Sequence, residues 1–239
     1  MNQTDRENSI GAHISLAQRI DHTNLKPTAT ETDIRKLCEE AWINGFKSIC
    51  VAPTYVPYVR EMMEFCPTKI EVCTVVGFPM GYHSPEVKLL EAEQAIRNGA
   101  TEIDVVMNLS KFKSMAYMSV RHEIEQLVQM AHAQAAVTQA VILKVIIETA
   151  YLDSFELHTA CEICAEAGAD FVKTSTGFAP QGADLDTVRL MRGILPSWVK
   201  IKASGGIQTY QQAHDFVAAG ADRIGTSAGV AMLLNQPQR

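Results

Sequence analysis

Lys173 lies in the middle of a short apolar run, and its chemistry there is the first clue to function. In residues 168–177 the strand-like pair Phe171-Val172 precedes this lysine, and a loop of small residues follows it. Burying an ammonium group without a partner is costly, so such a lysine either lies at the open end of a strand or loses its proton. A deprotonated lysine is a nucleophile that forms a Schiff base with a carbonyl compound. Lys173 is therefore the first candidate catalytic residue.

A second lysine and an aspartate extend this chemistry. Lys202 occupies the next strand-like run along the chain, and Asp104 occupies an earlier one. Two ammonium groups on neighbouring strands lower each other's affinity for protons, so one of them can be neutral near pH 7 and attack a carbonyl group. The resulting iminium permits cleavage or formation of a C–C bond, while Asp104 and the remaining lysine move protons through water. The alternative is a structural ion-pair network of Asp104 with both lysines, and spacing alone leaves it open.

Small residues close the last three strand-like runs and predict a phosphate-binding cradle. Backbone N–H groups in loops of this kind, together with a helix N-terminus, bind phosphate in (β/α)8 enzymes. Each glycine alone also suits a plain turn, so the prediction rests on their joint placement at three successive strand ends. The residues concerned are Gly177, Gly205, Gly206, Gly225 and Ser227.

The elements that must position these residues repeat along the chain. Gly45, Gly99, Gly168 and Gly220 each end a helical pattern just before a strand-like run, as left-handed helix C-caps do. Eight alternations of strand and helix in 239 residues predict an α/β fold, a single-domain (β/α)8 TIM barrel. An open doubly wound sheet is the alternative, but no Gly-x-Gly-x-x-Gly motif follows an early strand. The predicted strands lie near 19–24, 47–52, 70–77, 102–107, 142–148, 170–175, 199–204 and 223–226.

Strand parity predicts which side chains enter the barrel, because successive side chains point to opposite faces. The apolar set of each strand must face the helices, which leaves the polar set inside. A barrel interior is normally packed with branched aliphatic residues, so charge there indicates a reaction site. Parity also turns Cys50 inward, where unsaturated aldehydes formed as side products could alkylate its thiol. The charged residues predicted to lie inside are Asp104, Lys144, Glu148, Lys173 and Lys202.

Composition narrows the function further. With 21 basic and 27 acidic residues the net charge is −6, which argues against a nucleic-acid or anionic-membrane surface. No apolar run reaches membrane-spanning length and the N-terminus carries no apolar signal, so we expect a cytoplasmic protein. We expect one domain over residues 1–239, with a polar N-terminal segment at about 1–15 and a short tail at about 233–239.

Cysteine and histidine placement predicts neither a metal nor a cofactor. The six cysteines lie within apolar patterns, which suits reduced thiols. Cys161 and Cys164 have the spacing of a redox or zinc pair, but they lie in a predicted helix without a second pair of ligands. The seven histidines are dispersed along the chain rather than clustered as the ligands of a metal site are.

The chain resembles the deoxyribose-phosphate aldolase family over about residues 16–232. The resemblance implies reversible cleavage of 2-deoxy-D-ribose 5-phosphate to acetaldehyde and D-glyceraldehyde 3-phosphate by a Schiff-base (class I) mechanism. It implies that Lys173 forms the Schiff base and that Asp104 and Lys202 transfer protons and tune the nucleophile. It also implies a homodimer or a higher homo-oligomer. The motifs that carry the resemblance are IDHT (20–23), VGFP (76–79), EIDVV (102–106), LKVIIET (143–149), FVKTSTG (171–177), KASGG (202–206) and RIGTS (223–227).

Two alternatives accompany this reading: another class I aldolase or a transaldolase acting on a phosphorylated sugar, and a non-catalytic barrel that binds phosphosugars. Some family members end in a tail with a terminal tyrosine that assists proton transfer, which the final residues 235–239 lack, so turnover could be lower. The candidate catalytic residues are Lys173, Asp104 and Lys202. The candidate substrate- and phosphate-binding residues are Thr23, Cys50, Lys144, Thr174, Gly177, Gly205, Gly206, Gly225 and Ser227.

Overall fold

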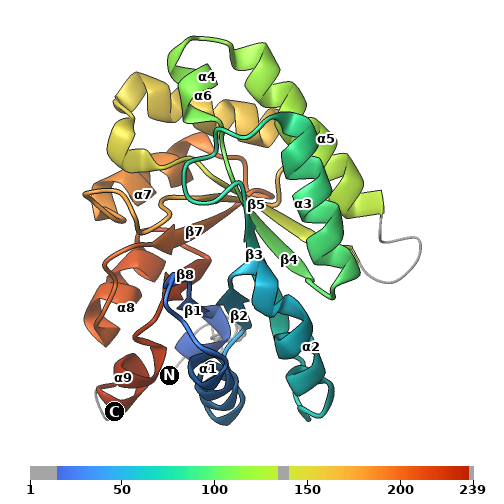
Figure 1. Ribbon diagram of the computed structural model, residues 1–239. Coiled ribbons are helices and arrows are strands. Elements are labelled where there is room, and N and C mark those ends of the chain that lie inside the picture. Colours follow the sequence, from blue (N-terminus) through green and yellow to red (C-terminus); the bar gives the residue numbers. More distant parts are fainter. Residues whose placement is uncertain (1–14, 134–139, 237–239) are drawn as a thin grey trace, which may run out of the picture.

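Eight parallel strands close into one barrel in their order along the chain, which confirms the predicted (β/α)8 fold (Figure 1). The computed structural model describes residues 15–133 and 140–236. The strands are β1 Ile20–Asn24, β2 Ser48–Val51, β3 Glu71–Val76, β4 Glu102–Val106, β5 Ile142–Ile146, β6 Phe171–Lys173, β7 Lys200–Ser204 and β8 Arg223–Thr226. Strand β1 pairs with β8, so the first and last strands lie side by side and leave no free edge.

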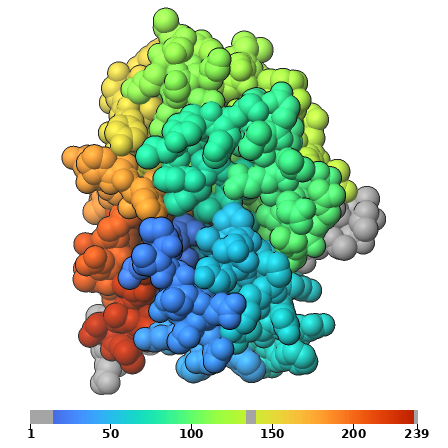
Figure 2. All heavy atoms as spheres, viewed as in Figure 1, coloured from blue at the N-terminus to red at the C-terminus, as the bar shows by residue number. Residues whose placement is uncertain are grey.

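Helices cover the outside of the barrel and follow the strands in alternation (Figure 1). The space-filling view shows the blue N-terminal surface directly against the red C-terminal surface, where the chain closes on itself (Figure 2). The helices are α1 Glu31–Asn44, α2 Val56–Glu64, α3 Pro85–Arg97, α4 Leu109–Lys113, α5 Tyr117–Ala133, α6 Ser154–Glu166, α7 Leu185–Ile194, α8 Tyr210–Ala218 and α9 Gly229–Leu234. Short 3-10 helices lie at Leu16–Arg19, Pro53–Tyr55 and Thr149–Tyr151.

The helix boundaries follow from side-chain caps. Thr30 accepts a hydrogen bond from the backbone N–H of Asp33, and the Asp33 carboxylate accepts one from the N–H of Thr30, so α1 starts with a capping box. The same reciprocal arrangement starts α6 at Asp153 and α8 at Thr209. Ser84 precedes α3 but makes no side-chain cap bond there.

The four glycines predicted at helix-to-strand junctions all adopt positive φ. Gly45 has a φ of 63°, Gly99 105°, Gly168 82° and Gly220 113°. Residues with a Cβ atom rarely adopt these angles, so glycine lets the chain turn sharply from a helix into the next strand. The repeated junctions therefore fix the alternation of helix and strand that the sequence predicts.

The core has two parts that differ in chemistry. Outward-facing strand residues such as Ile103 and Val105 are buried against the helices in one apolar layer. Inward-facing residues of the same strand, Glu102 and Asp104, are also fully buried, but among charged groups. The strands thus separate an ordinary hydrophobic layer outside from a polar interior that contains the site.

Strand ends differ slightly from the predicted ones. Strand β5 was expected to reach residue 148, but it stops at Ile146 because Glu148 has a φ of 48° and turns the chain into a 3-10 helix. Helix α9 extends to Leu234 and so enters the predicted C-terminal tail. Residues 1–14, which make up nearly all of the predicted N-terminal segment, and residues 237–239, the last part of the predicted tail, lie outside the described residues. In the part of the chain that the structure describes, no helix is both long and apolar enough to cross a membrane.

Candidate active site

A cavity of about 600 Å³ lies at the carboxyl ends of the strands. Its wall comes from helix α1 and from the loops that follow β1, β6, β7 and β8. Enzymes with this fold place their active sites at this end of the barrel. The sequence-predicted residues that line the cavity are Thr23, Lys173, Gly177, Gly205, Gly206, Gly225 and Ser227.

Lys173 connects this cavity with the barrel interior. It is the last residue of β6, lines the cavity and is only 3% exposed. Its Nζ atom donates a hydrogen bond of 2.7 Å to Asp104 Oδ2. On the neighbouring strand, Lys202 lies directly opposite Lys173 in the register, so both side chains point inward as parity predicts. A carbonyl compound in the cavity can therefore meet Lys173.

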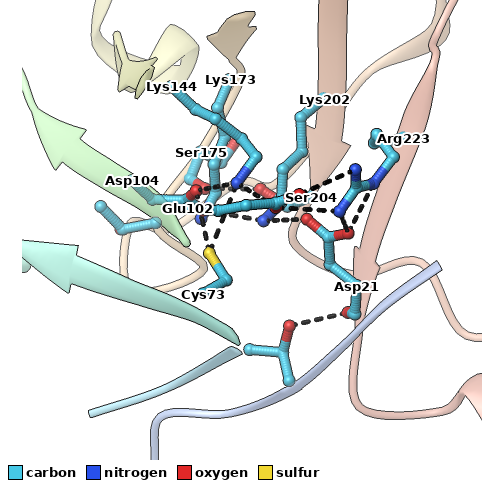
Figure 3. Close-up of polar contacts among 12 residues, drawn as sticks. Asp21, Cys73, Glu102, Asp104, Lys144, Lys173, Ser175, Lys202, Ser204 and Arg223 are labelled. Carbon is cyan, nitrogen blue, oxygen red and sulfur yellow. Dashed lines mark hydrogen bonds and ion pairs between the residues drawn. The ribbon is translucent and has the colours of Figure 1, made fainter. Parts of the chain in front are cut away.

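Asp104 gathers the three interior lysines (Figure 3). Its Oδ2 atom accepts hydrogen bonds of 2.7 Å from both Lys173 and Lys202, and its Oδ1 atom accepts one of 2.9 Å from Lys144. The thiol of Cys73 lies 3.2 Å from Oδ1. Burial opposes ionisation of this carboxyl group, but the interior lysines around it outweigh burial and hold the pKa of Asp104 well below its usual value. Asp104 is thus a carboxylate at neutral pH.

Lys202 and Lys144 keep their protons. Both are fully buried, which favours the neutral form of a lysine, yet the pKa of each is raised above its usual value. At Lys202, attraction to Asp104 and Asp21 raises the pKa by more than burial lowers it. At Lys144, Asp104, Cys73 and Glu102 together have the same effect. Parity alone left open which lysine is neutral. The raised pKa values of Lys144 and Lys202, and the position of Lys173 in the cavity wall, make Lys173 the candidate nucleophile.

Three further charged residues lie deeper in the barrel and were missed as site residues in the sequence. Arg223 donates hydrogen bonds to Asp21 and to Glu102. Asp21 Oδ2 lies 2.5 Å from Lys202 Nζ, and Glu102 Oε2 lies 2.7 Å from Lys144 Nζ. The available signal was strand parity, because Asp21 shares a face with Thr23, and Glu102 with Asp104.

Comparisons with known proteins agree with this geometry. Residues 15–239 match the model of a family described as DeoC/LacD family aldolase. The chain belongs to this aldolase family. A deoxyribose-phosphate aldolase from Caldanaerobacter subterraneus subsp. tengcongensis is 48% identical over 217 residues, which cover 91% of each chain. One from Thermococcus gammatolerans is also 48% identical over 217 residues, covering 91% of this chain and 94% of the relative.

The solved structures that resemble this aldolase include deoxyribose phosphate aldolase from Aeropyrum pernix, described as a unique tetrameric structure. It superposes with a TM-score of 0.82 at 38% identity and covers 92% of this chain and 89% of its own. The resemblance, the barrel fold and the assignment to the aldolases, which are lyases, are thereby confirmed.

Two glycines of the aldolase let the loops approach closely. A Cβ atom on Gly225 would lie 2.9 Å from Ser204 Cβ and 3.1 Å from Lys202 Cε, so this position must lack a side chain for Lys202 to fit. Gly205 has a φ of 91°, and a Cβ atom there would lie 2.8 Å from Gly182 Cα in the loop after β6. These glycines therefore let the cavity loops pack closely together.

Three of the predicted binding residues do not line the cavity. Lys144 is fully buried and bonds to Asp104 instead. Thr174 is fully buried, and its hydroxyl group bonds to the backbone C=O and N–H of Ser204. It therefore links β6 to β7. Cys50 is also fully buried, and a hydrogen bond from Cys73 lowers the pKa of its thiol despite the opposing effect of burial. Cys50 lies among the interior charges, and its reaction with unsaturated aldehydes stays a prediction.

The donor atoms of Cys50, Cys73 and Asp104 lie within 4.8 Å of one another, a spacing that could hold a metal ion. The chemistry around them does not fit a cation. Each oxygen of Asp104 already faces ammonium groups, which would repel a metal ion at this distance. Burial also keeps the pKa of Cys73 well above its usual value, so the thiol stays protonated and is a poor ligand.

Proposed function

We propose that this aldolase reversibly cleaves 2-deoxy-D-ribose 5-phosphate to acetaldehyde and D-glyceraldehyde 3-phosphate through a Schiff base on Lys173. One observation carries the proposal: a single cavity is lined both by Lys173 and by the glycine loops after β7 and β8. The first supplies a nucleophilic amine and the second supplies N–H donors for a phosphate group. The named activity of the relatives supports this substrate.

The reaction follows from the groups in place. Lys173 Nζ adds to C1 of the open-chain sugar, and loss of water gives the iminium. A base removes the proton of the C3 hydroxyl group, the C2–C3 bond breaks, and its electron pair moves into the iminium to give an enamine, which frees glyceraldehyde 3-phosphate. Protonation of the enamine at C2 and hydrolysis then release acetaldehyde and restore the lysine. Lys202 and Asp104 are buried behind Lys173, so we assign them to proton transfer through water.

The phosphate cradle is the second part of the proposal. Gly205 and Gly206 both have positive φ, a backbone form in which successive N–H groups can converge on an anion. Ser227 also lines the cavity, and Lys26 and Lys36 contribute cations to its wall. A dianion would thus meet both backbone donors and positive charge.

Acetaldehyde with borohydride should inactivate the enzyme and add one ethyl group to Lys173. The iminium formed on a neutral amine is reduced irreversibly, whereas protonated Lys144 and Lys202 cannot react. Peptide mass mapping after partial inactivation locates the label, with exposed Lys200 as the internal reference. Labels confined to exposed lysines, with activity retained, would contradict the Schiff-base assignment.

Ser227→Asp should raise the KM for deoxyribose 5-phosphate at least about 10-fold, because a carboxylate in the cradle repels the phosphate dianion. Acetaldehyde has no phosphate group, so its trapping on Lys173 should stay near the wild-type rate. Ser227→Ala is the matched control, since it removes the hydroxyl group without adding charge. If Ser227→Asp lowers cleavage of phosphorylated and unphosphorylated deoxyribose equally, the cradle lies elsewhere.

Three further assignments belong to this proposal. The enzyme forms a homodimer or a higher homo-oligomer, as the tetrameric relative from Aeropyrum pernix does in its own structure. It requires no cofactor, so activity should survive exhaustive chelation. A cytoplasmic location stays a prediction. Another class I aldolase or a transaldolase would also be trapped on Lys173, and comparison of kcat/KM among phosphorylated sugars separates these from the proposed activity.

A further inference from the structure

Six buried side chains form a closed ring of alternating charge inside the barrel (Figure 3). Each member contacts one neighbour on either side, at distances of 2.5–3.0 Å between the charged atoms. Five members are fully buried and Arg223 is 5% exposed. In order around the ring the members are Arg223, Asp21, Lys202, Asp104, Lys144 and Glu102.

This ring is electrically neutral without Lys173. It holds three cations and three anions, and Lys173 is attached to it from outside through Asp104 Oδ2 alone. That oxygen is already shared with Lys202, and the other oxygen with Lys144. A proton on Lys173 would therefore add a fourth cation to a balanced, buried set. An uncompensated buried charge is costly, so the balance favours the neutral amine.

We propose that Arg223 and Glu102, which touch neither Lys173 nor the cavity, are positioning residues that fix the protonation state of Lys173 by completing this neutral ring. The inference rests on the proposed role of Lys173 as the Schiff-base nucleophile. Arg223 supplies the third cation, without which the three carboxylates would be balanced only by a charged Lys173. Glu102 supplies the third anion. Without it the ring would carry a net positive charge, which would disfavour a proton on Lys173 still further.

The ring keeps its charges across the neutral range. Burial favours the neutral forms, but the neighbouring ions outweigh it: the pKa values of Asp21 and Asp104 are lowered, and those of Lys144, Lys202 and Arg223 are raised. Lys173 contacts this set of fixed charges through Asp104 Oδ2, so a change in the charge of the ring acts on its amine there.

Other titratable groups near the interior are bound to separate partners. Glu148 accepts hydrogen bonds from the backbone N–H of Thr176, and Glu71 pairs with Lys69 at 3.1 Å. Lys200 lies 5.6 Å from the centre of the Phe171 ring. The thiols of Cys50 and Cys73 face the ring, and Cys73 bonds to Asp104 and Lys144. Because the pKa of Cys50 is lowered, the test is repeated in a Cys50→Ser background.

The test measures trapping of acetaldehyde on Lys173 by cyanoborohydride against pH, together with the pH profile of kcat/KM. Arg223→Met should move the acidic limb of both profiles to higher pH by about one unit, and Glu102→Gln should move it to lower pH by a similar amount. The double variant restores the balance and should return the limb to the wild-type position. Arg189→Met, which removes an arginine that is 59% exposed, is the control and should leave the limb in place.

A drop in rate at every pH without a shift of the limb would show that Arg223 is only structural, and would overturn the inference. If Arg223→Met does not fold, Glu102→Gln alone decides, because an unshifted limb in that variant also overturns the inference. Arg223→Lys keeps the charge and should keep the limb. If wild-type protein is not trapped on Lys173 at any pH, the Schiff-base function itself is wrong, a result distinct from trapping without a shift.

Discussion

Lys173→Met should lower the rate of deoxyribose 5-phosphate cleavage by at least about 10⁴-fold, because the amine that forms the Schiff base is gone. Methionine has a similar length and fills the same space at the end of β6. The substitution leaves the ring of six charges complete, so the variant should be as stable as the wild type or more so. Cleavage assays with a coupled dehydrogenase and a thermal melt measure both quantities.

Lys200→Met is the matched control for this variant. Lys200 lies on the neighbouring strand β7 and shares the inward parity of Lys202, but it is exposed at the amino end of that strand. Its loss should change kcat less than about twofold, since a surface substitution away from the site has little effect. A Lys173→Met enzyme with more than a tenth of wild-type activity would exclude Lys173 as the nucleophile.

Asp104→Asn should lower kcat by about 10³-fold and also destabilise the protein by about 3–5 kcal/mol at pH 7. The first effect comes from the loss of the carboxylate that takes part in proton transfer. The second arises because the three interior lysines lose the carboxylate that they share. The ring would then hold the three cations Arg223, Lys144 and Lys202 against the two anions Asp21 and Glu102.

The pH dependence of stability separates this explanation from a simple packing defect. In the wild type, Asp21 and Asp104 have lowered pKa values, so their contribution is present above the unfolded value of about 4 and is lost as pH falls through the folded value. The contribution of Lys144 and Lys202, whose pKa values are raised, is present below about pH 10 and is lost only above it. The ring should therefore contribute the same stability to the wild type at pH 6 and at pH 9.

The Asp104→Asn variant should instead gain stability as pH rises from 6 to 9. Its surplus lysines release protons in the folded state that they would bind in the unfolded chain, which gives the stability a positive slope with pH. Urea unfolding at both pH values measures this slope. Asp186→Asn, at a position that is 84% exposed, is the control and should show no change. An Asp104→Asn variant with the wild-type slope would mean that the interior lysines are not coupled through Asp104.

The alternation of strand and helix was predictable because it depends on local signals. Glycine at positive φ ends a helix whatever lies around it, and Gly45 and Gly220 behave alike at opposite ends of the chain. Strand parity is equally local and correctly turned Lys173 and Lys202 inward. Thr174 follows the end of β6, and the contacts of its hydroxyl group with Ser204 depend on how β6 and β7 lie together, which the sequence alone did not show.

The closure of the ring could not be predicted from local signals. Arg223 and Asp21 lie near opposite ends of the chain and meet only because β8 pairs with β1. The contribution of α1 to the cavity wall, through residues such as Lys36 and Glu40, likewise depends on how the helix packs. Such contacts are set by tertiary structure, which a single sequence does not display.

The charges of the interior are divided unequally between the two halves of the barrel. Strands β1 to β4 contribute only carboxylates to the assembly, Asp21, Glu102 and Asp104, whereas β5 to β8 contribute only cations. Neither half could bury its own inner face, because like charges would repel one another without counterions. The two half-barrels are therefore electrostatic complements, and their mutual neutralisation disfavours pairing of either half with a copy of itself. The same charged side chains that surround Lys173 therefore also favour the correct closure of the barrel.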